Sequence, residues 1–251
     1  MKKFTAIVNF QTLIVVCLSF ISCYFTFTYR FTMYMNFFIF GLLIAFPITL
    51  TTKEAFKRRE RALQYLSQFK SSLQSIYFAI INSKIEVSEK EFFRNIATSW
   101  TTMLIDYLKT EKPGDTSTLH VVADKVASFV FRNRKALGGS RPDKILFFLS
   151  RVNDSVEFLL ATKRHRTPSG LNIVVKVAIF IFVIFYPATL LHETGASETF
   201  TYLFTSSVIK SIFLISLLNV QELLEDPFNQ IGADDIRMDD FQFTTQVLPS
   251  R

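Results

Sequence analysis

Four long apolar stretches limit what this chain can fold into. Residues 4–29 and 31–52 contain no charged side chain, and a second pair at 177–191 and 199–221 is interrupted only by Lys210. A helix of about 20 apolar residues crosses the roughly 30 Å hydrocarbon core of a bilayer. The sequence therefore predicts helices that cross a membrane, with the lipid bilayer as the partner of most of their surface.

The third stretch is short for a span unless residues 171–176 extend it, with the Lys176 ammonium reaching toward the lipid headgroups. With that extension the sequence predicts an all-α membrane protein with four transmembrane helices in two hairpins. The chain then divides into a first transmembrane hairpin, a helical cytosolic domain, a second transmembrane hairpin and an acidic cytosolic C-terminal segment, at residues 1–52, 53–170, 171–221 and 222–251.

A cleaved secretory signal is the alternative interpretation of the first stretch. Met1-Lys2-Lys3 precedes it, and Ile21-Ser22-Cys23 resembles a lipoprotein cleavage site. The apolar core of a signal is about 7–15 residues long, whereas this stretch continues past Cys23 and a second span follows directly after Arg30. We therefore expect a retained hairpin, in which Cys17 and Cys23 act as small apolar residues.

The formal net charge of +7 has two interpretations, a nucleic-acid partner or membrane topology. With four spans, both termini and the segment between the hairpins lie on the same side of the membrane. The basic residues collect at the span ends on that side, and an excess of Lys and Arg is typical of the cytoplasmic side. We therefore expect no nucleic-acid partner, both termini in the cytosol, and a plasma or bacterial inner membrane rather than an organelle. The residues are Lys2, Lys3, Lys53, Lys57, Arg58, Arg59, Arg61, Lys163, Arg164 and Arg166.

The segment between the hairpins has helical periodicity and no defensible strand pattern. Residues 55–81 lack Gly and Pro and carry apolar side chains at three- and four-residue spacing, which predicts one long helix continuing the second span. Ser88 stands three residues before Glu91, the spacing of a capping box that begins the next helix. Further helices are predicted over residues 117–135 and 143–162, with a turn at 138–140.

Sequence motifs for catalysis or cofactor binding are absent. The chain contains no P-loop, no Gly-rich dinucleotide motif, no nucleophile elbow and no zinc-spaced Cys/His set, and its three histidines lie on separate segments. We therefore expect neither an enzyme nor a resident cofactor or metal. The carboxylates near the C-terminus do not match an EF-hand and favour a solvated acidic segment attracted to the basic face; they are Glu222, Glu225, Asp226, Asp234, Asp235, Asp239 and Asp240.

Lys210 is a charge at membrane depth. Insertion of such a residue costs about 2.5–3.5 kcal/mol, so it usually faces a helix-bundle interior or a watery cavity. It lies near the middle of the fourth stretch beside Ser206, Ser207 and Ser211. One interpretation gives it a role in conduction or in the potential of a vestibule; the other has it pair with backbone or bend toward an interface.

A second feature at membrane depth is the spacing of Leu42, Phe46 and Leu50, which recur every four residues on one helix face, with Gly41 and Pro47 alongside. Such a stripe ordinarily faces lipid or a protein core. If several copies of the helix surrounded an axis, it would instead form stacked apolar rings, a constriction that gates by dewetting. Periodicity alone leaves both interpretations open.

The order of hairpin, helical insert, hairpin and acidic tail resembles the bestrophin family of ion channels. Glu222-Leu223-Leu224-Glu225-Asp226-Pro227-Phe228 looks like the family's E-x-L-E-x-P-F signature, and Asp235-Ile236-Arg237-Met238-Asp239 resembles its downstream D-L-P-L-D element. Arg58 lines up with the Arg of a family Arg-Trp-Trp-Glu-Ala segment, although the paired Trp is missing. Arg166-Thr167-Pro168-Ser169-Gly170 is similar to a family T-P-x-P segment.

The resemblance implies a homopentamer that conducts ions passively through one axial pore. Carried over by position, the rings of a hydrophobic neck fall on Leu42, Phe46 and Leu50, and a cytosolic aperture falls on Ser169. The basic residues near that aperture and vestibule, Arg58, Lys163, Arg164 and Arg166, favour chloride or a similar anion.

Two alternatives stand beside the anion channel. One is a cation-permeable homologue, since the family includes a bacterial cation channel. The other is a non-conducting regulatory or interaction protein on the same scaffold, whose basic helices bind anionic lipid or a protein partner. Calcium control is not expected, because Asn229-Gln230-Ile231-Gly232 stands where the family's successive aspartates would follow Phe228.

Overall fold

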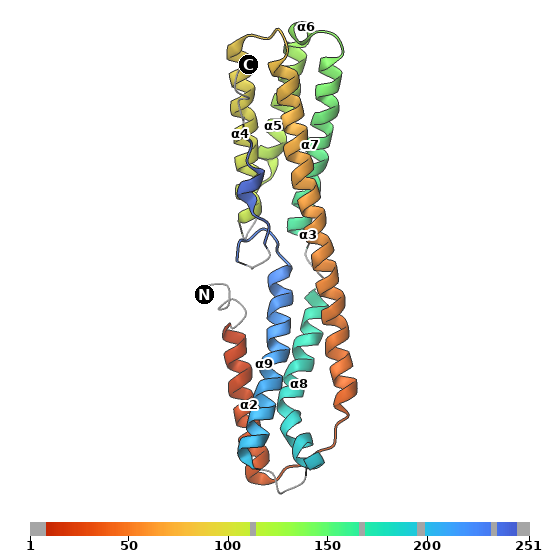
Figure 1. Ribbon diagram of the computed structural model, residues 1–251, viewed down its shortest axis with the longest axis vertical. Helices are drawn as coiled ribbons and strands as arrows, with labels where there is room; N and C mark the ends of the chain where they lie inside the picture. The colour runs from red at the N-terminus through yellow and green to blue at the C-terminus, as the bar shows by residue number, and fades with distance from the viewer. Residues whose placement is uncertain (1–8, 111–113, 166–168, 195–198, 232–234, 245–251) are drawn as a thin grey trace, which may run out of the picture. The chain divides into compact units, whose positions relative to one another are not determined.

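The computed structural model of the chain describes residues 9–110, 114–165, 169–194, 199–231 and 235–244. In these ranges the regular structure is helical and contains no strand, as the sequence predicted. The helices, shown in Figure 1, are α2 (Phe10–Tyr29), α3 (Phe37–Ile81), α4 (Val87–Lys109), α5 (Ser117–Arg132), α6 (Arg134–Leu137), α7 (Arg141–Arg164), α8 (Ser169–Thr194), α9 (Phe200–Leu224) and the short 3₁₀ helix η1 (Met238–Phe241).

The chain forms two compact units. The membrane unit comprises the described parts of Met1–Lys57, Thr167–Asp226 and Ile231–Asp234. The helical unit comprises those of Arg58–Arg166, Pro227–Gln230 and Asp235–Arg251. Helix α3 contributes its residues up to Lys57 to the membrane unit and the remainder to the helical unit.

Four helices of the described chain, α2, α3, α8 and α9, are long and apolar enough to cross a membrane. The predicted number of spans is therefore confirmed. Helix α8 runs without a break from Ser169 to Thr194, so residues 171–176 do extend the third span. Helices α2, α8 and α9 lie along one another (Figure 1) and bury an apolar core that includes Val15, Ile179 and Leu218.

Helix α2 has clear start and stop signals. The Asn9 side chain accepts hydrogen bonds from the backbone N–H groups of Gln11 and Thr12, at 3.0 and 3.2 Å, which satisfies two of the donors exposed at a helix start. The helix ends at Arg30, which adopts the left-handed conformation with φ 50° and donates its backbone N–H to the Thr26 carbonyl.

The helical unit is built around one face of α3. Leu66, Phe69, Leu73, Ile76 and Ile80 are all buried there, as their three- and four-residue spacing predicted. They pack against buried side chains of α4, α5 and α7, among them Trp100, Phe129 and Leu159, and the Phe69 and Trp100 rings meet edge to face at 5.9 Å.

Helix α4 does not begin with the predicted capping box at Ser88, so that prediction is wrong. The helix begins at Val87, and the Lys90 N–H already bonds to the Glu86 carbonyl at 3.1 Å. Ser88 thus lies inside the first turn, where its hydroxyl donates to the Glu86 carboxylate at 3.4 Å instead of capping. The predicted helix over residues 117–135 is likewise divided, since α5 ends at Arg132 and the four-residue α6 follows Asn133.

Candidate functional site

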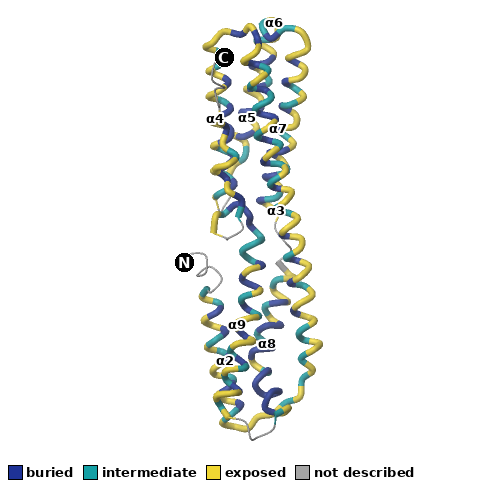
Figure 2. Tube along the Cα trace, in the orientation of Figure 1, coloured by how far each residue is buried: buried dark blue, intermediate teal, exposed yellow. Residues whose placement is uncertain are grey.

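The membrane part of α3 has one packed face and one open face. Ile44 and Ile48 are buried in the core of the membrane unit, with 1% and 5% of their surface exposed. Leu42, Phe46 and Leu50 lie on the opposite face and are 60%, 62% and 46% exposed. The stripe singled out in the sequence is therefore the side of α3 that its own chain leaves uncovered, and Figure 2 shows how much of this helix is exposed.

Helix α3 is the least covered of the four spans. In its most apolar window 17% of the residues are buried, against 56% for α8. Lipid tails are as apolar as these side chains, so the exposure costs nothing in a bilayer, but it leaves the surface available to other helices.

Pro47 interrupts the hydrogen-bond ladder of α3, because proline has no N–H to donate. Two threonines follow it. The Thr51 hydroxyl donates to the Pro47 carbonyl at 2.9 Å, and the Thr49 hydroxyl donates to the Ala45 carbonyl at 2.7 Å. Both hydroxyls are thus satisfied within the helix; Thr51 is buried on the packed side, and Thr49 is exposed.

Lys210 extends from α9 to Tyr186 of α8. Its ammonium donates a hydrogen bond to the Tyr186 hydroxyl and lies 4.4 Å from the centroid of the same ring, a cation–π contact. The Tyr186 hydroxyl is also 3.2 Å from the Ser206 hydroxyl. Of the three serines noted beside Lys210 in the sequence, Ser206 joins this network, whereas Ser207 and Ser211 are buried elsewhere on α9. Tyr186 itself was not predicted as a partner.

The first half of the signature binds α9 to α8. Glu222 forms an ion pair with Lys176 at 2.6 Å, and Glu225 accepts a hydrogen bond from the Asn172 amide at 2.9 Å. Gln221 donates to both Asn172 and Glu225, at 3.0 and 2.7 Å. We call these five residues the α8–α9 clamp. Lys176 therefore has a carboxylate partner where the sequence had suggested only a route to the headgroups.

The second half of the signature packs within the helical unit, against Ile236. Phe228 is fully buried, and the Ile236 N–H bonds to the Pro227 carbonyl at 2.9 Å. Gln230 has φ 63° and donates its side-chain amide to the Ile236 carbonyl at 2.6 Å. The Asp226 side chain of the membrane unit is also buried, so these residues are structural rather than part of a solvated segment.

Farther along, the acidic tail does meet basic residues. Asp239 pairs with Lys109 at 3.2 Å, and the Asp240 carbonyl accepts a hydrogen bond from Lys70 at 2.7 Å. Both contacts lie within the helical unit. Asp234 falls outside the described residues.

The basic residues assigned to a vestibule lie in unlike surroundings. Arg164 is exposed and donates to the Tyr107 and Thr116 hydroxyls at 3.2 and 2.9 Å. Lys163, its neighbour, is buried with 4% of its surface exposed, and Arg58 is partly exposed. Arg166 and the Ser169 side chain lie outside the described residues.

The connection before α5 carries the clearest electrostatic effect outside the spans. The Ser117 hydroxyl and its backbone N–H both donate to the Asp115 carboxylate, the backbone bond at 3.0 Å. These bonds, with a smaller contribution from the Arg164 charge, lower the pKa of Asp115 below its ordinary value. Arg164 therefore helps hold an ordered loop as well as presenting positive charge.

In the described part of the chain, no group of three or more His, Cys, Asp or Glu side chains is placed to hold a metal ion. His120 lies 3.4 Å from Glu157, and His192 packs beside Tyr34 with 5.7 Å between ring centroids. The site is thus defined by the exposed face of α3 and the polar contacts that fix α8 and α9 beside it.

Four apolar helices around a shared apolar core make the chain an integral membrane protein of all-α fold. Solved structures identify that fold. The crystal structure of a substituted bacterial bestrophin homologue from Klebsiella pneumoniae matches 94% of this chain and 96% of that chain, with a TM-score of 0.73 and 15% sequence identity. A second substituted form matches 93% and 94% of the two chains, with a TM-score of 0.74 and 14% identity. The chain has the bestrophin-like fold, as its sequence signature predicted.

No family model and no curated protein matches the chain. A likeness at 14–16% sequence identity is one of fold. Function therefore has to be argued from the site, because one fold serves many functions.

Proposed function

We propose that this protein is a passive ion channel in which several copies of the chain, arranged as a pentamer, surround one axial pore lined by α3. The observation that carries the proposal is the exposed apolar stripe of Leu42, Phe46 and Leu50, directly opposite the packed Ile44 and Ile48. In a ring of copies this stripe forms stacked apolar constrictions, which gate by dewetting. The likeness in fold to bestrophin homologues supports the same arrangement.

Oligomerisation follows from the number of spans. Each chain supplies one copy of α3, the span that its own chain covers least, so a single chain cannot enclose a pore with this helix. The low burial of α3 within its own chain leaves that helix free to pack against other copies as well as lipid. The two termini are assigned to the cytosol on the distribution of Lys and Arg.

Anion preference is the part of the proposal that rests on charge. Arg164 and Arg166 precede the proposed aperture at Ser169 by a few residues of sequence, and together with Arg58 their positive charges favour chloride or a similar anion. Arg164 is exposed, and the Tyr107 and Thr116 hydroxyls hold its guanidinium in place. Lys163 is buried, so it would add to the positive electrostatic potential without itself contacting water.

The test is conductance of the purified protein in planar bilayers. Phe46→Ala widens and wets the proposed neck, so it is expected to raise the current several-fold over the unaltered protein. Phe25→Ala is the matched control, because Phe25 is 53% exposed but lies on α2. An equal effect of both substitutions, or none from Phe46→Ala, contradicts a neck on α3.

Selectivity and assembly are tested separately. Reversal potentials in asymmetric chloride are expected to lie near the anion potential; values near the cation potential would identify a cation-permeable channel instead. A strictly monomeric protein in detergent and in bilayers, without current, would favour the interaction protein and overturn the channel.

A further inference from the structure

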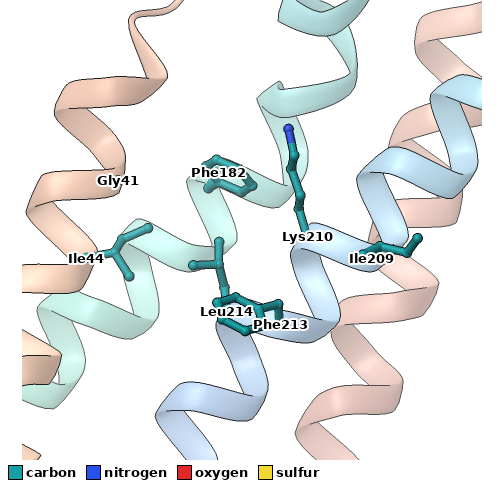
Figure 3. Close-up of a pocket in the computed structure, with 7 residues that line it drawn as sticks. All are labelled: Gly41, Ile44, Phe182, Ile209, Lys210, Phe213 and Leu214. Carbon is teal, nitrogen blue, oxygen red and sulfur yellow. The ribbon is translucent and has the colours of Figure 1, made fainter.

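The open face of α3 ends in positive charge. The side chains that α3 buries in the membrane unit recur at three- and four-residue spacing and therefore mark one packed face; they are Ile44, Ile48, Thr51 and Ala55. In Figure 3, Ile44 extends from this face toward Phe182 of α8 and Leu214 of α9. Because the packed face continues as far as Ala55, the open face on the other side of the helix continues at least as far.

Lys53 and Lys57 lie on that open face. Lys53 follows Phe46 by seven residues, which is two helical turns, and Lys57 follows Leu50 by the same number. Both lysines are exposed. Lys53 is also the first charged residue after the charge-free stretch of residues 31–52, and it lies about 4.5 Å past Leu50 along the helix axis. The apolar stripe therefore runs directly into a positive charge.

The charges of the two lysines are balanced differently. The Lys57 ammonium forms an ion pair with Glu54 at 2.8 Å. Lys53 has no hydrogen bond or ion pair within the described residues. The Lys210 ammonium is directed onto the Tyr186 ring inside the membrane unit, so it does not supply charge to this face of α3. Lys53 thus remains as an exposed, unbalanced charge at the end of the stripe.

We propose that Lys53 is a selectivity-determining residue of the pore and holds a small monovalent anion, such as chloride, where the neck ends. The inference rests on the channel proposed above, in which copies of α3 surround one axis with the stripe facing inward. In that arrangement the Lys53 side chains form a positive ring next to the apolar ring of Leu50. Rings of Lys or Arg favour anions in pores, and each ammonium has three N–H donors for an ion that has lost water in the neck.

The apolar neighbours make this charge effective. Low-dielectric walls beside charges of one sign focus the field and raise the local concentration of counter-ions by about 10- to 1000-fold. The side chains of Phe46 and Leu50 provide such a wall and carry no group that could bind a cation. Lys57 adds less, because the Glu54 carboxylate beside it offsets its charge. The unpaired Lys53 therefore decides the sign of the ion that enters the neck from this end.

Reversal potentials of the purified full-length protein in planar bilayers test this assignment. Lys53→Gln should lower the permeability ratio of chloride to sodium roughly ten-fold, because the local enrichment of anions is lost, whereas Lys53→Arg should keep the ratio. The matched control is the double variant Glu54→Gln, Lys57→Gln, which removes one charge of each sign from the same helix and should leave the ratio nearly unchanged. The effect of Lys53→Gln should shrink in about 1 M salt, where the screening length falls to about 3 Å.

Chemical restoration of the charge separates its effect from that of side-chain size. The background is Cys17→Ser, because Cys17 is exposed whereas Cys23 is buried. In this background, Lys53→Cys should regain the ratio of the unaltered protein when a methanethiosulfonate reagent attaches an ethylammonium group. It should not regain the ratio when the attached group is an ethylsulfonate; equal recovery with both reagents would contradict a role for the charge.

Three further results would overturn the assignment. A ratio unchanged by Lys53→Gln, in a protein whose current rises with Phe46→Ala, excludes Lys53 from selectivity and leaves the channel standing. An equal fall of the ratio in the double variant would mean that any change on this part of α3 disturbs selectivity. An unaltered protein without current overturns the channel and, with it, the role of Lys53.

Discussion

The side-chain amides of Asn9 and Asn219 bind each other reciprocally across 210 positions of sequence, with N–O distances of 3.2 and 3.3 Å. The Asn219 amide also donates to the Thr12 hydroxyl at 3.1 Å. Asn219 is 1% exposed, so this pair joins the start of α2 to the last turns of α9 inside the membrane unit. These hydrogen bonds fix the N-terminal end of α2, the first span, beside the C-terminal end of α9, the last span.

Removing the Asn219 amide is expected to loosen this join. Asn219→Ala should lower the free energy of unfolding by about 1 kcal/mol, the usual strength of a polar contact between membrane helices. Thermal unfolding in detergent measures the change. Asn9→Ser is the companion variant, since serine keeps the helix cap but cannot return the amide bonds. The double variant should cost less than the sum of the two; strict additivity would mean that the two amides act independently.

Gly138 is expected to tolerate no side chain because of its backbone conformation, although there is room for a Cβ atom. Its φ of 66° and ψ of 151° lie in a region that residues with a Cβ rarely adopt, although a Cβ there meets nothing within 4 Å. Gly138→Ala should therefore destabilise the turn before α7 by about 1–3 kcal/mol, seen as a lower midpoint of thermal unfolding. Gly114→Ala, equally unobstructed and without a positive φ, should leave the midpoint nearly unchanged.

Asp115 gives a stability that depends on pH. Its pKa is lowered mainly by the Ser117 hydroxyl, so the folded chain binds this proton less readily than the unfolded chain. The contribution is fully present above the unfolded pKa, near 3.8, and is lost as the pH falls through the lower folded value. The difference in melting temperature between the unaltered protein and Asp115→Asn should therefore shrink from about pH 6 to about pH 3.

Ser117→Ala provides the check on that cause. Without the hydroxyl, the pKa of Asp115 should return toward its ordinary value and the pH dependence should weaken. Ser71→Ala, on α3 away from the loop, serves as the control substitution. A pH profile that Ser117→Ala leaves untouched would mean that other carboxylates cause the loss of stability in acid.

The four spans and the long helix of the helical unit were predictable because apolar length and periodicity are local properties. Between Leu66 and Ile80 the apolar side chains recur at three- and four-residue spacing, which places them on one helix face, and that face is buried. The start of α4 was not predictable from Ser88, because one hydroxyl at the right spacing does not decide where the backbone enters the helix.

The candidate site was only half visible in the sequence. The stripe through Phe46 could be found from spacing alone, whereas its exposure depends on which face of α3 the other helices cover. Partners such as Tyr186 for Lys210 and Asn219 for Asn9 lie far away in sequence, and residue type gives no hint of which distant group a polar side chain will meet. The acidic signature was visible as a motif, but its division between the clamp and buried residues of the helical unit was not.

The ion pair between Lys176 and Glu222 allows a charge-exchange experiment on the α8–α9 clamp. The side chains are 34% and 27% exposed, so the pair is partly shielded from water and should be worth about 1–2 kcal/mol. Lys176→Glu alone places three carboxylates near Asn172 and should lower the unfolding midpoint by more than the loss of the pair. Adding Glu222→Lys restores opposite charges at the same two positions and should recover most of the stability. If the exchanged pair is no more stable than Lys176→Glu alone, the clamp depends on its amide hydrogen bonds and the ion pair contributes little.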